Sequence, residues 1–288
     1  MERNNRDKGA GGKGQRRGEK GAGRTSKVAR KRFGQHFLEP AWVAKIVEAM
    51  EPRPTDTFLE IGPGRGALTR PLAARAHRVI AVEIDRDLAA ALQAEAISNL
   101  RLIQSDVLAL SFADVLREEA RPVRVAGNLP YNISSPVLFA VLAAADGGQL
   151  FSDATLMLQK EVADRLVATP GGKDYGALAI QVSLVADVER LLTLPPGAFR
   201  PPPKVTSAVV RLRFHAPRVD VGDARVFERI VRGMFLQRRK TVANALRPVC
   251  AALGCEVANL LERAHVNGGV RPEALTLPEI AALSRAVL

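Results

Sequence analysis

Short apolar segments alternate with helical segments between residues 57 and 160, and this alternation constrains the fold more than any other feature of the sequence. It predicts parallel strands joined by crossover helices that cover both faces of one sheet. Such a sheet binds ligands at the carboxyl ends of its strands, so the residues that follow each strand are the first candidates for function. The expected strands are residues 57–62, 78–85, 99–106, 123–128 and 154–160.

The rest of the chain differs in composition from this α/β region. Residues 177–188 and 207–214 resemble strands near a sheet edge, and the proline-dense segment between them cannot lie inside a sheet. From about residue 222 onward the pattern is helical. We therefore expect a tail over residues 1–30, an α/β domain over residues 31–215 and a helical domain over residues 216–288.

The positive charge of the chain is concentrated near its N-terminus. Residues 1–32 contain 12 Lys and Arg against 3 Asp and Glu, and the whole chain has a net charge of +12. A tail that is basic, rich in glycine and poor in apolar residues is expected to be disordered alone. It suits a polyanion, with nucleic acid ahead of an acidic membrane. A solubilising extension without a specific partner is the alternative.

The sequence lacks patterns for secretion, membrane insertion, a disulfide framework or a zinc site. It has neither an apolar signal segment nor a run of about 18 apolar residues. The 2 cysteines, Cys250 and Cys255, have no His or Cys partners at metal-binding spacing and are expected to be reduced thiols. These features predict a cytoplasmic protein without a bound metal.

A glycine-rich sequence, E-I-G-P-G-R-G at residues 60–66, follows the first expected strand. Gly62 and Gly64 would let the backbone approach a ligand closely, and the next helix offers its N-terminus. Nicotinamide and flavin enzymes have similar loops, and a tight strand-to-helix turn is a further alternative. Glu83 ends the second strand about 20 residues later, a spacing at which a carboxylate can accept ribose hydroxyls.

Polar residues also end the third and fourth strands. Asp106 could accept a hydrogen bond from an adenine amino group, although it could also cap a helix. Dinucleotide enzymes do not generally need this third acid, so it favours an adenosyl ligand without a pyrophosphate. The sequence N-L-P-Y at residues 128–131 combines an amide, carbonyls and an aromatic ring. That combination suits a flat molecule with an amino group; a turn with a packed tyrosine is the alternative.

Nine stretches of the sequence resemble the KsgA/RsmA-type small-subunit rRNA adenine dimethyltransferases, which use S-adenosylmethionine. They cover nearly all of the chain from residue 31 to the end. The resemblance implies a Rossmann-like class I S-adenosylmethionine methyltransferase domain with a small C-terminal all-α domain. The stretches are K-R-F-G-Q-H-F-L, E-I-G-P-G-R-G, V-I-A-V-E-I-D, Q-S-D-V, G-N-L-P-Y-N-I-S-S-P, M-L-Q-K-E-V-A-D-R-L, F-R-P-P-P-K-V-T-S-A-V-V, Q-R-R-K-T-V-A-N-A-L and R-P-E-A-L-T-L.

The resemblance also implies how the cofactor is held. Many members have Asn at the position of His36, so a side-chain contact there is expected to differ, whereas backbone contacts are expected to be kept. The expected cofactor-binding residues are Gln35, His36 and Leu38 at the methionine end, Gly62 and Gly64 beneath the cofactor, Glu83 at the ribose, Asp106 and Val107 at the adenine, and Asn128 between cofactor and target base.

Methyl transfer from a sulfonium to an adenine amino group is expected to need neither a metal nor a covalent intermediate. Positioning should dominate, because fixing reactants in line can supply roughly 7–11 kcal/mol. The Asn128 side-chain oxygen and a carbonyl of Leu129 or Pro130 are expected to accept the two amino protons. Tyr131 is expected to stack on the base, and Phe199 to close its other face.

The implied substrate is small-subunit rRNA, with dimethyladenosine formed on two adjacent adenosines near its 3′ end. A base that is paired in a helix must be extruded to reach such a site. The implied partner is a precursor of the small ribosomal subunit, and the protein is expected to act as a monomer in its biogenesis. Candidate phosphate contacts are Arg200, Lys204, Arg238, Arg239 and Lys240.

Three other functions remain open from the sequence. The nearest is a large-subunit rRNA adenine methyltransferase of the macrolide-resistance type, which shares the cofactor motifs; F-R-P-P-P-K-V and R-P-E-A-L-T-L favour the small-subunit type. A dinucleotide-dependent oxidoreductase is a second alternative. A non-catalytic RNA-binding or assembly factor is the third.

Overall fold

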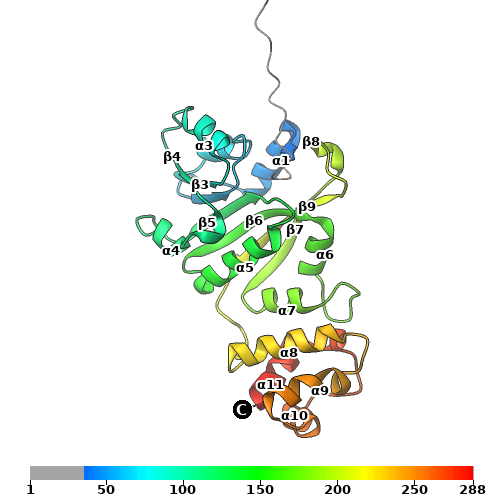
Figure 1. Cartoon of the computed structure of the whole chain (residues 1–288). Helices are drawn as coiled ribbons and strands as arrows, with labels where there is room; N and C mark the ends of the chain where they lie inside the picture. The colour runs from blue at the N-terminus through cyan, green and yellow to red at the C-terminus, as the bar shows by residue number, and fades with distance from the viewer. Residues whose placement is uncertain (1–35, 288) are drawn as a thin grey trace, which may run out of the picture.

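A computed structural model of the 288-residue chain describes residues 36–287. The expected basic tail of residues 1–30 and the expected cofactor contact Gln35 lie outside the described residues. The described part consists of a central sheet flanked by helices, followed by a group of C-terminal helices (Figure 1).

The central sheet has seven strands in the order β4-β3-β2-β5-β6-β9-β7. The first five strands in this order are parallel, and β9 is antiparallel to both of its neighbours. The strand order reverses at β2 and β5, which is where sheets of this kind open a crevice for ligands. The bounds are β2 Thr57–Ile61, β3 Arg78–Glu83, β4 Leu100–Gln104, β5 Val123–Asn128, β6 Phe151–Gln159, β7 Ala186–Leu194 and β9 Ser207–Phe214.

The prediction of a strand over residues 177–188 is wrong for the first half of this segment. Residues 177–188 were expected to be extended, but the structure has helix α7 over Ala177–Ser183, and β7 begins only at Ala186. A short apolar run has the same composition in a strand and in a buried helix, so the segments that pack against it determine which of the two forms. Here Ile180 packs in the core of the C-terminal helices while Val182 packs beneath the sheet.

Helices cover both faces of the sheet because residues alternate between its faces along each strand. Phe58 and Val79 pack against α1 and α2, whereas Leu59 and Ile80 pack on the other face, where α4, α5, α6 and α7 lie. The bounds are α1 Pro40–Met50, α2 Thr69–Ala73, α3 Arg86–Gln93, α4 Phe112–Val115, α5 Ser134–Ala144 and α6 Lys160–Leu166.

The C-terminal helices pack around a second core, which they share with α7, below the sheet in Figure 1. Ile230, Met234, Leu246 and Leu283 are fully buried in this core. The apolar positions recur at helical spacing, which is why the whole region folds as helices. The bounds are α8 Ala224–Leu236, α9 Val242–Leu253, α10 Val257–Ala264 and α11 Leu277–Val287.

A small two-stranded sheet joins two segments far apart in the sequence. Strand β1 (Phe37–Leu38) pairs antiparallel with β8 (Phe199–Arg200). This pairing brings the first described residues beside the proline-dense loop. Both segments thereby reach the carboxyl side of the central sheet, where β5 ends.

Candidate active site

The loop after β2 makes a turn that requires glycine. Gly62, Gly64 and Gly66 have φ of 68°, 57° and 75°, a backbone region that residues with a Cβ rarely adopt. A Cβ on Gly66 would lie 2.8 Å from Leu92 Cδ1, so a larger residue at that position would also require this side chain to shift. The loop can therefore turn sharply at the end of β2 and present its backbone to the space above the sheet.

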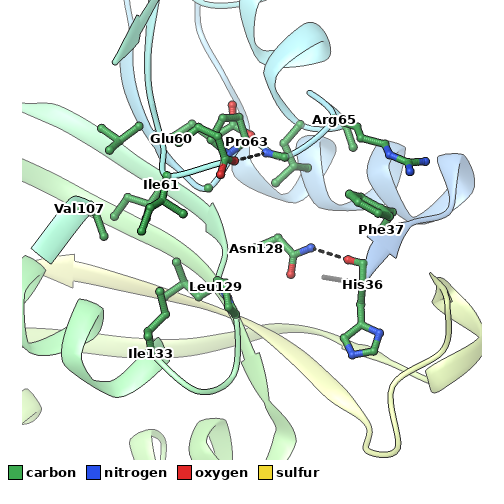
Figure 2. A pocket seen from close by; sticks show the side chains of 18 of the residues that line it. His36, Phe37, Glu60, Ile61, Pro63, Arg65, Val107, Asn128, Leu129 and Ile133 are labelled. Carbon is green, nitrogen blue, oxygen red and sulfur yellow. Dashed lines mark hydrogen bonds between the residues drawn. The ribbon is translucent and has the colours of Figure 1, made fainter. Parts of the chain in front are cut away.

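A cavity of about 420 Å³ lies above the ends of β2, β3, β4 and β5 (Figure 2). This volume falls in the range of small-molecule sites. Most of the expected cofactor and catalytic residues that the structure describes line it. They are His36, Leu38, Gly62, Gly64, Glu83, Asp106, Val107, Asn128, Leu129, Pro130 and Tyr131.

Glu83 is held rigidly in the cavity wall. Its two carboxylate oxygens accept the backbone N–H groups of Gly64 and Asp85, each at 2.9 Å. The side chain is buried, with 5% exposure. Each oxygen has a second lone pair, so the carboxylate can still accept hydroxyl groups of a ligand.

Asp106 lies between apolar side chains at the next strand end. One of its carboxylate oxygens accepts Leu108 N–H at 2.9 Å, so the helix-capping alternative is realised, and the side chain still lines the cavity. Ile84 and Leu108 are 50% and 43% exposed, which is unusual for large apolar residues. Together with Val107 they offer a surface for a flat apolar ring.

The residues after β5 are fixed by contacts with other segments. Asn128 donates its Nδ2–H to the backbone oxygen of His36 (3.2 Å), which leaves its side-chain oxygen as the free acceptor of the amide (Figure 2). The Tyr131 hydroxyl lies 2.6 Å from that of Ser207. Burial raises the pKa of Tyr131, so the phenol stays protonated. Pro130 O accepts Ile133 N–H at 3.1 Å.

Phe199 does not take the position expected of it. Its ring is 1% exposed and packs in the core with Ala198, Leu194 and the residues of α1. It is absent from the cavity lining, so it cannot close a face of a bound base in this conformation. The proline-dense loop does reach the site, but through the backbone: Pro201 O lies 2.7 Å from His36 Nδ1.

The five expected phosphate contacts lie outside the cavity. Arg200 is 80% exposed and donates to Glu39 at 2.6 Å, and Lys204, in the loop that follows, is also exposed. Arg238 donates to Lys173 O at 2.9 Å and is thus partly used within the protein. Its neighbours, Arg239 and Lys240, are exposed.

Glu60 lines the cavity, although no motif in the sequence singles it out. It is 1% exposed, and its Oε2 has no hydrogen-bond partner among the described residues. Burial, and to a lesser extent the charge of Glu83, raises the pKa of Glu60 to about 7, although Thr69 and Arg70 oppose the rise. The alternation along β2, in which Glu60 shares a face with Phe58, could have indicated its burial.

The sheet order, the glycine loop and the cavity at the strand ends define the Rossmann-like fold of class I S-adenosylmethionine methyltransferases, here with a C-terminal group of helices. The sequence model of the ribosomal RNA adenine dimethylase family matches residues 26–268. The chain therefore belongs to this family and is a methyl-transferring enzyme.

Relatives of known name agree with this placement. Ribosomal RNA small subunit methyltransferase A of Geobacter metallireducens is 47% identical over 268 residues, covering 90% of this chain and 96% of the relative. The enzyme of the same name from Xanthomonas campestris is 46% identical and covers 86% and 91%.

Two solved structures resemble the whole described fold. A dimethyladenosine transferase from Plasmodium falciparum has a TM-score of 0.71 at 26% identity, covering 86% of this chain and 96% of that one. The 23S rRNA methyltransferase ErmE has a TM-score of 0.63 at 27% identity, covering 87% and 99%. Among residues 36–287, no helix is long and apolar enough to cross a membrane.

Proposed function

We propose that this protein uses S-adenosylmethionine to dimethylate the exocyclic amines of two adjacent adenosines near the 3′ end of small-subunit (16S) rRNA. The observation that carries the proposal is the run of Glu83, Asp106 and Asn128–Tyr131 along one cavity. The small-subunit enzymes are 46–47% identical to this chain, whereas ErmE is 27% identical, which favours small-subunit over large-subunit rRNA.

The cavity residues suit the parts of S-adenosylmethionine in order. Glu83 would accept the ribose hydroxyls and Asp106 the adenine amino group, with Val107, Ile84 and Leu108 against the ring. The turn at Gly62 and Gly64 would lie beneath the cofactor, with Leu38 and the backbone of His36 near the methionine end. When bound, the cofactor supplies an activated methyl group on a sulfonium.

The residues after β5 would orient the amino group of the target adenine. The side-chain oxygen of Asn128 would accept one amino proton, because its NH₂ group is already bonded to His36 O. A carbonyl of Leu129 or Pro130 would accept the other. Both bonds favour a nitrogen whose lone pair points toward the methyl group, and orientation of this kind can supply roughly 7–11 kcal/mol.

Tyr131 would receive the extruded base on its ring. Base–aromatic stacking contributes roughly 1–3 kcal/mol per base and offsets part of the cost of leaving the helix. The hydrogen bond to Ser207 would keep the ring in one orientation. The phenol itself would not exchange protons with the substrate, because its pKa is raised.

Basic residues outside the cavity would hold the rest of the RNA. Arg200, Lys204, Arg239 and Lys240 are exposed and could contact phosphates, as could Arg238 if it exchanged its present partners. Structured RNA is bound mainly through its shape and backbone, which suits the helical domain of residues 216–288. The basic tail would add contacts. The setting would be the cytoplasm, on a precursor of the small subunit, with the protein acting as a monomer in its biogenesis.

The test is incubation with labelled S-adenosylmethionine and small subunits from a strain that lacks this methylation. Nucleoside analysis should give dimethyladenosine, and Asn128→Ala should lower its rate of formation at least 100-fold, the usual scale for loss of a group that positions the reaction. Gln93→Ala is the control, because Gln93 has an exposed amide side chain in α3, outside the cavity lining. Methylation of large-subunit RNA instead would support the macrolide-resistance type of enzyme.

A further inference from the structure

The ring of His36 faces the ring of Tyr131 at the end of the cavity where β5 stops. The two ring centroids are 6.0 Å apart and the planes are inclined by 27°. Both residues line the cavity, together with Asn128. Two roughly parallel rings therefore stand beside the amide that would bind the target amino group.

Each ring is fixed by a hydrogen bond to a different segment. His36 Nδ1 lies 2.7 Å from Pro201 O. Since a carbonyl can only accept, Nδ1 carries the proton and Nε2 is free of it in the neutral imidazole. The backbone of His36 is bonded to Asn128 (3.2 Å), and Tyr131 is bonded to Ser207 (2.6 Å).

An extruded base is best held by a contact on each of its two faces. The expected second contact, Phe199, is buried elsewhere. A base between two rings needs a separation of about 7 Å, which is two van der Waals contacts of about 3.5 Å each. The observed 6.0 Å would have to widen by only about 1 Å.

We propose that the imidazole of His36 forms the second face of the slot for the target adenine, opposite Tyr131. His36 is then divided in function: its backbone belongs to the methionine end of the cofactor site, and its side chain to the acceptor site. This inference rests on the proposed function and adds a residue that positions the base. Because stacking involves the faces of the base, it should affect the first and second methylations alike.

The test uses small-subunit rRNA with 2-aminopurine in place of one target adenosine, bound to the full-length protein. Fluorescence of this base is quenched when aromatic rings sandwich it. We expect the 2-aminopurine emission to be weak in the complexes with wild type and with His36→Phe. In the complex with His36→Ala it should be several-fold brighter. The exposed His77 precedes the first residue of β3, whereas the cavity lies at the last residues of this strand, so His77→Ala provides the control variant.

Methylation of unmodified subunits gives an independent measurement. We expect His36→Ala to lower kcat/KM about 10-fold or more for both methylations, with His36→Phe close to wild type, on the scale measured for loss of one base stack. The Kd for S-adenosylmethionine should stay within about twofold, because only the backbone of His36 serves the cofactor. Retained activity of His36→Phe would also show that substitution at this position leaves the fold intact.

Two results would overturn the inference while the proposed function stands. In the first, wild type forms dimethyladenosine but His36→Ala leaves both quenching and kcat/KM unchanged. In the second, His36→Ala weakens cofactor binding as much as it slows methylation. If wild type forms no dimethyladenosine at all, the proposed function and this inference fail together.

Discussion

The hydroxyl of Tyr131 lies 2.6 Å from the hydroxyl of Ser207, and this contact spans the neighbouring strand. Tyr131 follows β5, whereas Ser207 is the first residue of β9, and β6 lies between these two strands. Ser207 is fully buried. The aromatic ring of the candidate site is thus tied to the antiparallel part of the sheet rather than to its own loop alone.

Removal of this hydrogen bond should loosen the ring without disturbing the cofactor site. For Ser207→Ala we expect a loss of about 1 kcal/mol in the free energy of unfolding, the usual net value of one hydrogen bond. The turnover number should fall about 3- to 10-fold if the freed ring costs about 1 kcal/mol in the transition state. Urea unfolding and single-turnover methylation measure the two effects.

Tyr131→Phe is the matched partner, because it removes the other hydroxyl of the same bond. The double variant should be little worse than either single variant, since residues that share one bond are not additive. Fully additive losses would mean that Ser207 acts through some other contact.

The strand ends of the site were predictable because they depend on local sequence. The alternation of strands and helices, the positive φ at Gly62 and Gly64, and the carboxylate of Glu83 at the end of β3 all follow from short-range patterns. The burial of Phe199 was not predictable, because its environment is set by the pairing of β1 with β8, which joins distant segments. Local sequence does not encode which face of such a pairing is buried.

The misassigned α7 and the overlooked His36–Tyr131 stack have the same physical origin. The apolar residues of α7 are equally compatible with a strand and with a helix. The contact of Ile180 with the C-terminal helices distinguishes the two, and it is a tertiary contact. The side chain of His36 faces Tyr131 only because Asn128 and Pro201 hold it there. Both features depend on tertiary contacts, which override local propensity.

Glu60 should make the stability of the protein fall as pH rises from about 4.5 to about 7. Its pKa is raised from 4.5 to about 7 in the folded state, so within this window the folded protein keeps a proton that the unfolded chain has lost. The contribution is fully present below pH 4.5 and is lost once the pH passes the folded-state value.

Glu60→Gln mimics the protonated form and should remove this dependence. The difference in free energy of unfolding between Glu60→Gln and wild type should shift in favour of the variant as the pH rises through this window. The shift should reach up to about 3 kcal/mol, since each pKa unit corresponds to about 1.4 kcal/mol. Urea unfolding at several pH values measures it, with the exposed Glu161→Gln as a control for the loss of one carboxylate. A difference that stays constant with pH would contradict the raised pKa.

The basic residues 238–240 should divide into one structural and two RNA-binding side chains. Arg239 and Lys240 are exposed, whereas Arg238 donates to Lys173 O and lies 3.7 Å from Glu273. Arg239→Ala and Lys240→Ala should each reduce the slope of log affinity against log salt by about 1. Binding of a small-subunit rRNA fragment at several salt concentrations measures these slopes.

Arg238→Ala serves as the comparison within the same segment. It should lower the thermal stability of the protein and change the salt slope less than either neighbour does. Equal slopes for all three variants would indicate that Arg238 leaves its protein partners when RNA binds.

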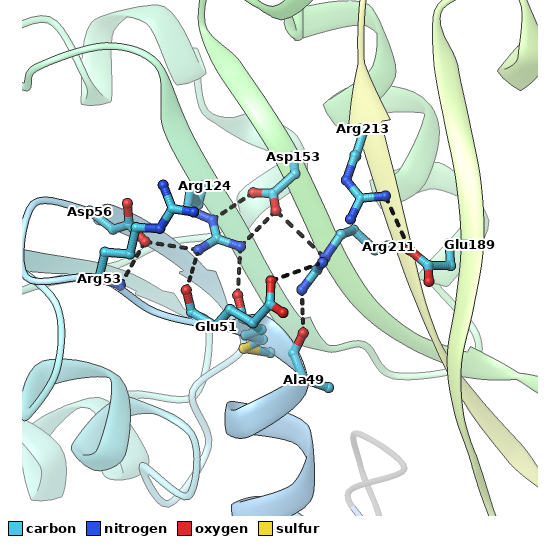
Figure 3. Close-up of polar contacts among 10 residues, drawn as sticks. Ala49, Glu51, Arg53, Asp56, Arg124, Asp153, Glu189, Arg211 and Arg213 are labelled. Carbon is cyan, nitrogen blue, oxygen red and sulfur yellow. Dashed lines mark hydrogen bonds and ion pairs between the residues drawn. The ribbon is translucent and has the colours of Figure 1, made fainter.

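The buried ion-pair network at the other end of the sheet should stabilise the fold strongly (Figure 3). The Arg124 guanidinium contacts both oxygens of Asp153 at 2.7 and 2.9 Å, and reaches Asp56 at 2.8 Å. It also donates to the carbonyls of Met50 and Glu51, at 2.7 and 3.2 Å, where α1 ends. Arg124 thereby connects β5, β6 and the C-terminal end of α1.

Arg124→Ala should lower the free energy of unfolding by about 3–5 kcal/mol, because it removes the main cationic partner of two largely buried carboxylates, Asp56 and Asp153. Arg213, which pairs with Glu189 at 3.1 Å on the surface, is the matched control in the same view. Both of these side chains are more than half exposed, so Arg213→Ala should cost less than about 1 kcal/mol. Urea unfolding with an unchanged m-value measures both variants. Equal losses would mean that burial adds nothing to the Arg124 network. Arg211 lies 3.8 Å from Asp153 in the same network, so a small loss for Arg124→Ala alone would mean that water or Arg211 compensates for the missing charge.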